Sequence, residues 1–413
     1  MLLLVGTACG PGDVAGDGST GTTEAESETG PGPGESETEG ESGSETETET
    51  ETETETGSPP DLPTNDCAAF SEAGSFDELC YADPLVIDPD PVNFIDRFGT
   101  NSGPRYYVAG PNNHRAYSYD DAGPLPDPEQ LAIDGTVVDA THPILFENPP
   151  APVYVIATKD PNALVVLTLG DPIEVAAVIP LAAEPTALAS IYHGQPYRDA
   201  VVSADATGRL SLFTAADVGM LELDSWRDLD EPVEELQYAY SWIDEFRDLA
   251  LVGLSRASSS FQVLELPGVA NGPLSSWSPA LDVSGYLIHS FADEVADDLL
   301  VLSREPAAMA LHSQPGVDPA WTMPLPHPVE RTSRQPEDWV GGGQTPEVEF
   351  YGLSIEHARI GSLGTTTGDG TTMMPSQSWV EVPSDTVAFL PIGKARFLCA
   401  SETEGLSLLA PLP

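Results

Sequence analysis

The sequence predicts an all-β chain folded as a seven-bladed β-propeller and preceded by a disordered acidic linker. From about residue 61, short apolar runs alternate with Pro, Gly, Asp and Asn, and no long stretch has helical periodicity. One strand-like pattern, the anchor, occurs seven times. Successive anchors start 46 to 51 residues apart. This nearly constant step matches the length of a four-stranded propeller blade.

Each anchor is an apolar run that ends in a small residue. The seven anchors are residues 105–110, 153–158, 199–204, 248–253, 298–303, 349–354 and 396–401. A further strand-like run precedes each anchor: residues 92–95, 137–140, 188–191, 236–239, 286–289, 338–341 and 387–390. Another run follows most anchors after a turn. Each repeat therefore predicts one antiparallel sheet, which buries both faces only when sheets stack around an axis.

The two ends of the domain are expected to meet. The last repeat stops at Pro413 without a clear fourth strand, and residues 85–88 (Leu-Val-Ile-Asp) precede the first repeat. We expect residues 85–88 to complete the last blade and close the ring. Residues 361–374 are polar and are expected to form an insertion in the sixth repeat. The alternative architecture, two β-sandwiches, does not predict a constant step.

The N-terminus consists of a short apolar run and a cysteine. Residues 1–9 (M-L-L-L-V-G-T-A-C) resemble the end of a bacterial lipoprotein signal peptide, with Cys9 as the lipidated residue. The resemblance implies a lipid-anchored protein of the outer membrane or cell surface. An ordinary cleaved signal, with secretion, and no signal at all are the alternatives. No later segment has the roughly 18 apolar residues that a membrane-spanning helix needs.

Residues 10–60 are rich in Gly, Ser, Thr and Glu and end in a Glu-Thr alternation. No Lys or Arg occurs before Arg97. This composition has no apolar face to bury, and its like charges extend the chain. We interpret it as a disordered tether that carries the propeller domain, residues 61–413.

The charge of the chain excludes some partners. The formal net charge is -52, and binding to nucleic acid phosphates requires a basic surface. Nucleic acid is therefore not an expected partner, and electrostatic docking to an anionic membrane is excluded by the same sign argument. A lipid on Cys9 remains the expected route to the membrane.

Three cysteines follow Cys9. Cys67 and Cys80 flank a short turn-rich stretch, and Cys399 lies in an apolar run. A Cys67–Cys80 disulfide is predicted, and closing a loop of this size contributes on the order of 3 kcal/mol. A Cys80–Cys399 bridge, which would join the two ends of the ring, and free thiols are the alternatives. Outside a bridge, Cys399 is expected to be a small buried residue.

Three anchors begin with aspartate, at Asp199, Asp248 and Asp298, and each follows a polar loop. This form resembles FG-GAP/VCBS repeats, which implies a propeller of the kind seen in the integrin α-chain head. In that family the loop holds Ca2+ through carboxylates. Here the positions four, six and eight before Asp298 are Glu294, Ala292 and Ser290. These loops have too few carboxylates to predict bound calcium, and no other cofactor or metal is predicted.

Common enzyme motifs are absent from the sequence. His193 and His289 occupy corresponding places in two repeats and are the histidines expected to face the central channel. Trp339, beside a run of three glycines, is expected on an exposed loop, where it stacks on a sugar or a protein. For all three residues, packing inside or between blades is the alternative interpretation.

These observations favour a non-catalytic cell-surface lipoprotein, a monomer that binds or scaffolds a protein or carbohydrate partner. The alternative is a propeller-type hydrolase or dehydrogenase that acts on a sugar, lactone or alcohol. A structural protein without a ligand is the third possibility. An enzyme requires a carboxylate or histidine pair near the axis, whereas a binding module requires exposed aromatic residues at one rim.

Overall fold

A computed structural model describes residues 76–413 with internal gaps. The gaps are residues 101–102, 112, 121–122, 125–126, 143, 146–150, 192–199, 218–219, 241–248, 256–257, 259, 266–273, 278–283, 293–296, 313–317, 335–347, 368–369, 373 and 394. The chain divides into two units, Met1–Leu62 and Pro63–Pro413. All described residues belong to the second unit.

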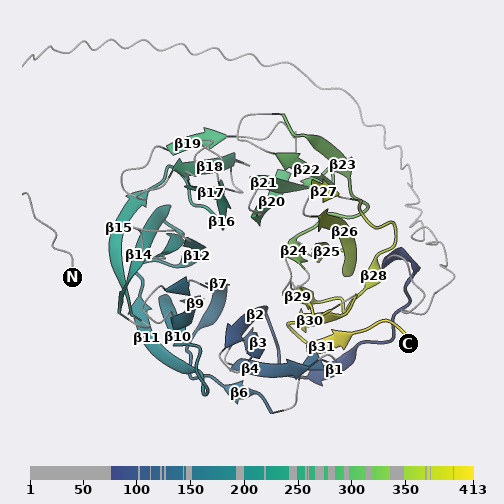
Figure 1. Cartoon of the computed structure of the whole chain (residues 1–413), viewed down its shortest axis with the longest axis horizontal. Helices are drawn as coiled ribbons and strands as arrows, with labels where there is room; N and C mark the ends of the chain where they lie inside the picture. Colours follow the sequence, from purple (N-terminus) through teal and green to yellow (C-terminus); the bar gives the residue numbers. More distant parts are fainter. Residues whose placement is uncertain are drawn as a thin grey trace, which may run out of the picture. The chain divides into compact units, whose positions relative to one another are not determined.

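The described residues form seven antiparallel sheets arranged around an axis, a seven-bladed β-propeller (Figure 1). Blade 1 contains β2 (Phe94–Thr100), β3 (Gly103–Gly110), β4 (Asn113–Asp120) and β5 (Gly123–Pro124), with β6 (Glu129–Gln130) beside β4. Blade 2 contains β7 (Thr136–Thr141), β9 (Ala151–Lys159), β10 (Ala163–Thr168) and β11 (Glu174–Pro180), with β8 (Ile144–Leu145) beside β9. Blade 3 contains β12 (Pro185–Ile191), β13 (Ala200–Asp205), β14 (Arg209–Asp217) and β15 (Met220–Asp228).

The next three blades repeat this order, with the first strand innermost (Figure 1). Blade 4 contains β16 (Glu235–Tyr240), β17 (Leu249–Ser255), β18 (Ser260–Glu265) and β19 (Leu274–Trp277). Blade 5 contains β20 (Ser284–Ala292), β21 (Asp297–Glu305), β22 (Ala308–His312) and β23 (Trp321–Pro324). Blade 6 contains β24 (Arg331–Arg334), β25 (Val348–Ser354), β26 (Arg359–Thr367) and β27 (Gly370–Thr372), with β28 (Val380–Glu381) beside β26.

Blade 7 is built from both ends of the described chain. It contains β29 (Thr386–Pro391), β30 (Phe397–Ser401), β31 (Gly405–Leu409) and, on its outer edge, β1 (Leu85–Asp88). Leu85 pairs with Leu408 and Asp88 with Leu406 in the antiparallel β1–β31 ladder. The prediction that residues 85–88 close the ring is confirmed, and the two-sandwich alternative is wrong.

All seven anchors are second strands of their blades.

Two predictions for blade 6 are wrong. Its inner strand is β24, which precedes the predicted residues 338–341; those residues lie outside the described set. Residues 361–374, predicted as an insertion, contribute most of β26 and all of β27. The Gly and Thr residues of this hairpin gave no apolar signal from which strands could be recognised.

The small residue at the end of an anchor has a recurrent structural role. Thr158, Ser303 and Ser354 are fully buried. Thr158 Oγ1 donates to the carbonyl of Pro161 at 3.0 Å, and Ser303 Oγ donates to that of Pro306 at 2.6 Å. Each hydroxyl therefore satisfies a carbonyl of the tight turn that follows its strand.

The core of the propeller lies between neighbouring blades. One cluster of buried residues joins blades 7 and 1, for example Leu398 and Leu406 against Ile95 and Tyr106. Comparable clusters lie between blades 1 and 2, 2 and 3, 3 and 4, 5 and 6, and 6 and 7. Blades 1, 2, 3, 6 and 7 are thus apolar on both faces, and this pattern is stable only when a neighbour covers each face. The short 3-10 helix η1 (Phe76–Glu78) adds Phe76 to the cluster between blades 6 and 7.

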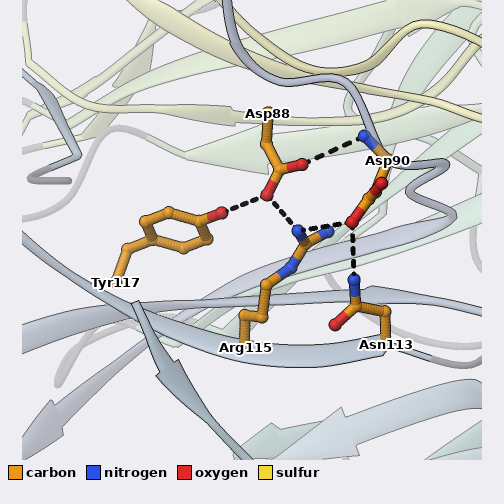
Figure 2. Close-up of polar contacts among 5 residues, drawn as sticks. All are labelled: Asp88, Asp90, Asn113, Arg115 and Tyr117. Carbon is orange, nitrogen blue, oxygen red and sulfur yellow. Dashed lines mark hydrogen bonds and ion pairs between the residues drawn. The ribbon is translucent and has the colours of Figure 1, made fainter. Parts of the chain in front are cut away.

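A buried ion pair joins the closing strand to blade 1 (Figure 2). Asp88 Oδ2 accepts hydrogen bonds from Arg115 Nη1 and from the hydroxyl of Tyr117, both on β4. Asp88 is 8% exposed and Arg115 3% exposed. Asp90 Oδ2 lies 3.3 Å from Arg115 Nη1 and accepts a hydrogen bond from Nδ2 of Asn113 at 2.9 Å. We call these five residues the closure cluster.

The closure cluster changes the acidity of its buried members. Burial by itself raises the pKa of Asp88, but hydrogen bonds from Tyr117, from the Asp90 amide and from Arg115 outweigh it, so the pKa lies below its usual value. Burial, followed by the bond to Asp88, raises the pKa of the Tyr117 phenol. Asp88 is therefore the ionised acceptor of the cluster, and Tyr117 is a donor.

Gly405 shows how closely β1 approaches β31. Its φ of +79° lies in the left-handed region, and a Cβ there would lie 2.1 Å from the carbonyl oxygen of Asp88. Only glycine combines this conformation with this approach. The turn into β31 and the ring closure thus require the same residue.

Cys80 is disulfide-bonded, whereas Cys399 is free and fully buried. The Cys80–Cys399 alternative is therefore wrong. Cys67, the predicted partner of Cys80, lies outside the described residues, so the Cys67–Cys80 pairing stays a prediction. Burial raises the pKa of the Cys399 thiol to about 12, as expected for a small packing residue.

Replacing Arg115 by methionine should lower the free energy of unfolding by about 3–5 kcal/mol, because the buried Asp88 carboxylate loses its cation. The double variant Arg115→Met, Asp88→Leu should cost less than the single variant, since it leaves no unpaired charge. Denaturant titration measures both.

The control is Lys159→Met, which breaks an exposed pair with Nζ of Lys159 3.4 Å from Oε1 of Glu184. Such exposed pairs contribute about 0–1 kcal/mol. Equal costs for Arg115→Met and Lys159→Met would contradict a closing role for the ion pair.

Candidate functional site

The structure describes few of the residues that the sequence singled out. Cys9, His193 and Trp339 lie outside the described residues. His289 belongs to the inner strand β20. At this position the structure describes the backbone, which does not test where the side chain points. The expectations for these four residues stay predictions. Of the loop positions compared with calcium-binding repeats, Glu294 lies outside the described set, whereas Ser290 and Ala292 belong to β20.

A polar cluster joins the inner strands of blades 1 and 2. The hydroxyl of Tyr154, on β9, donates to Oδ2 of Asp96, on β2, at 2.7 Å. Nε2 of His142, just after β7, lies 3.2 Å from the same oxygen. The His142 ring packs against Tyr154 with centroids 4.7 Å apart, and Tyr154 stacks on Phe98 at 4.9 Å. We call Asp96, His142, Tyr154 and the nearby Asp139 the axial cluster.

Asp139 connects blade 2 to blade 3. Its Oδ2 accepts the backbone N–H of Leu188, on β12, at 2.8 Å, and its Oδ1 accepts the N–H of Ala140 at 2.8 Å. Burial raises the pKa of Asp139 to about 7, against the lowering effect of these two bonds and with a further increase from Asp96. The charge of Arg331, on β24 of blade 6, lowers this pKa. Groups from several inner strands therefore influence one another around the axis.

The axial cluster contains the carboxylate–histidine pair that an enzyme would need. However, both oxygens of Asp96 already accept hydrogen bonds, since Oδ1 accepts the N–H of Arg97 at 2.7 Å. The Tyr154 side chain is fully buried. Burial, followed by the charge of Asp96, raises the pKa of its phenol well above the ordinary value. Tyr154 is therefore a permanent hydrogen-bond donor, and the cluster first of all ties inner strands together.

Two histidines lie close together beside blade 6. The rings of His327 and His357 are 4.7 Å apart, and Nδ1 of His357 is 3.1 Å from Oγ of Ser354. Burial, followed by His357 and Arg359, lowers the pKa of His327. Within the described ranges, no group of three or more His, Cys, Asp or Glu side chains is arranged to hold a metal ion.

The outer rim of blade 3 carries exposed apolar side chains. Leu223 and Trp226 of β15 are 54% and 48% exposed. The guanidinium of Arg209, on β14, lies 4.1 Å from the Trp226 ring centroid, and its Nε donates to Oδ1 of Asp228 at 2.8 Å. We call Leu223, Trp226 and Arg209 the blade 3 rim. Sequence reasoning selected Trp339 instead because Trp226 lies in an ordinary strand without a glycine-rich loop.

The described part of the chain contains no helix with the length and apolar character that crossing a membrane requires.

The pKa of Asp139 predicts a pH-dependent stability. Because the folded-state pKa is raised from 3.8 to about 7, the carboxyl stabilises the fold fully below about pH 4, and this contribution is lost as pH rises through about 7. The variant Asp139→Asn does not titrate. The unfolding free energy of the wild type minus that of the variant should therefore fall from pH 4 to pH 8 in denaturant titrations.

Gln377→Ala, at an exposed side chain that does not titrate, is the control and should show no comparable change. A wild-type-minus-variant difference for Asp139→Asn that stays constant or rises with pH would overturn the assignment.

Comparisons with known proteins support the fold alone. No protein family model matches the chain, so the resemblance to FG-GAP/VCBS repeats stays an expectation drawn from three anchors. No curated protein sequence matches either. Two similar solved structures are crystals of BBS1N in complex with ARL6DN, one soaked with lead and one with mercury. They are each 10% identical to this chain, with TM-scores of 0.55 and 0.54. Each similarity covers 81% of this chain and 97% of the other, so the chain shares the propeller fold of these proteins.

Proposed function

We propose that the protein is a non-catalytic binding or scaffolding lipoprotein of the outer membrane or cell surface. A lipid on Cys9 attaches the chain to the membrane, and the acidic tether of residues 10–60 holds the propeller away from it. Like-charge repulsion extends such a tether. The propeller then presents its rim to a protein or carbohydrate partner.

The blade 3 rim is the observation that carries this proposal. Tryptophan and arginine are the residue types most enriched at the energetic centres of protein interfaces. Trp226 is half exposed, and Arg209 stacks on it while Asp228 holds the guanidinium. The tryptophan is therefore partly ordered before binding, which reduces the entropic cost of an interface.

The similar solved structures support a binding role. BBS1N was crystallised in complex with ARL6DN. A propeller of closely related shape thus serves in a protein complex. The similarity does not identify the partner of this chain, because 10% identity leaves few rim residues in common.

The alternative function, hydrolysis or oxidation of a sugar, lactone or alcohol, would use Asp96 and His142 as an acid–base pair. The geometry favours it less. Asp96 accepts bonds from Tyr154 and from the Arg97 amide, so the carboxylate has little free capacity to orient a reacting group.

Lipidation of Cys9 predicts incorporation of a palmitate analogue into the full chain in the producing cells. The variant Cys9→Ala should lose this label and move from the membrane fraction to the soluble fraction. Cys399→Ala, at a buried free thiol, is the matched control and should keep both properties. Unchanged labelling of Cys9→Ala would sink the lipid anchor.

A binding role predicts a specific neighbour at the blade 3 rim. A photo-crosslinking amino acid at position 226 of the full chain should yield a discrete, saturable adduct on intact cells. The same substitution at Val178, which is 59% exposed on the outer strand of blade 2, should yield much less of it. Identical adduct patterns at the two positions would contradict a binding surface at this rim.

A further inference from the structure

The outermost strand of blade 3 is unusual among the seven outer strands. β15 has nine residues. The other outer strands, β5, β11, β19, β23, β27 and β1, have 2, 7, 4, 4, 3 and 4. β15 ends its sheet and pairs with β14 on one side, and no described strand pairs with its other side. Figure 1 shows it at the periphery of the ring. The backbone N–H and C=O groups of β15 that point away from β14 therefore have no partner strand in the described part of the chain.

Two of the usual protections against strand pairing, shortness and proline, are absent from this edge. Natural edge strands are commonly protected by shortness, proline, charged side chains or β-bulges, and β15 has the last two. β5, β11 and β23 each end in proline. β15, with the sequence Met-Leu-Glu-Leu-Asp-Ser-Trp-Arg-Asp, contains neither proline nor lysine. Among the outer strands that the structure describes, β15 is thus the longest, and its outer side has no described partner strand.

A β-bulge organises the side chains of β15. Leu212 pairs with Ser225 and Phe213 with Leu223, so Asp224 is an extra residue in the ladder. Without it, strict alternation would place Leu223 and Trp226 on opposite faces. With it, both share the face of Phe213, which packs in the cluster between blades 2 and 3. The apolar residues therefore form one stripe along the open edge.

The charges on β15 restrict what can occupy it. Glu222 and Asp224 are exposed, Asp228 is shared with Arg209, and Arg227 is the one basic residue of the strand. The formal net charge of the whole chain is -52. A second copy of the chain, or its own acidic tether, would bring further negative charge to this edge. An occupant with basic and apolar residues would complement both the stripe and the carboxylates.

We propose that β15 binds an extended, alternating apolar and basic segment of a partner protein by strand addition. This inference rests on the proposed binding function and specifies its mode and partner chemistry. The segment pairs its backbone with the free edge of β15, places its apolar residues against Leu223 and Trp226, and directs its basic residues to Glu222 and Asp224. Main-chain bonds supply affinity, and the stripe sets the register.

The test uses the full chain and a fluorescent nine-residue peptide of alternating Val and Lys, with binding measured by anisotropy. Strand addition uses one backbone edge of the peptide. Two isomeric peptides are therefore N-methylated either on the Val or on the Lys residues, which keeps charge and side chains constant. One isomer should bind about tenfold or more weakly than the other. A Val–Glu peptide should not bind.

The matched variants separate the edge from general charge attraction. The double variant Leu223→Ser, Trp226→Ser should weaken binding by about tenfold or more, as loss of a tryptophan centre does. Val175→Ser, Val178→Ser removes comparable exposed side chains from β11 and should leave binding unchanged. Both pairs are surface substitutions, and thermal unfolding verifies that both variants fold.

Equal binding of the two N-methylated isomers, or equal loss in both double variants, would overturn strand addition. If photo-crosslinking at position 226 still gives its discrete adduct, the binding function stands and the mode is wrong. If the adduct is also absent, the binding function itself fails.

Discussion

The pairing of β1 with β31 is the constraint on which the rest of the structure depends. Blades 1 and 7, which meet at this closure, are each apolar on both faces, and an open ring would expose two such faces. Strand pairing is reinforced by a buried charge. Asp88 tolerates burial because Arg115 and Tyr117 donate to it, and Nε and Nη2 of Arg115 have no partner among the described residues. The two charges are therefore mutually dependent, and each holds the first and last blades in register.

Polar contacts are arranged differently at the axis and at the rim. Near the axis, Asp96 and Asp139 accept hydrogen bonds from neighbouring strands, so these carboxylates act within the protein. At the rim, the outer strands of blades 2 and 3 contact each other. Leu223 and Trp226 are nevertheless exposed, although they lie on the same face as the buried Phe213. The exposed apolar side chains of blade 3 therefore lie at its periphery, whereas the carboxylates near the axis already accept hydrogen bonds.

BBS1N and this chain share a propeller fold at 10% sequence identity. Few side chains are therefore common to the two chains, and the fold does not require a particular side chain at most positions. The blade 3 rim and the closure cluster depend instead on individual side chains, which the fold permits but does not demand.

The sequence by itself determined the class of fold, the number of blades and the closing strand, because apolar runs at a constant step are local signals. It did not locate β24, since Arg-Thr-Ser-Arg has no apolar pattern and becomes a strand only by pairing with β25. It also missed Asp88–Arg115, whose partners are 27 residues apart, and Trp226, whose face is set by the extra residue Asp224. Only the tertiary structure decided these features, because each depends on a neighbouring strand or blade that brings residues distant in the sequence together.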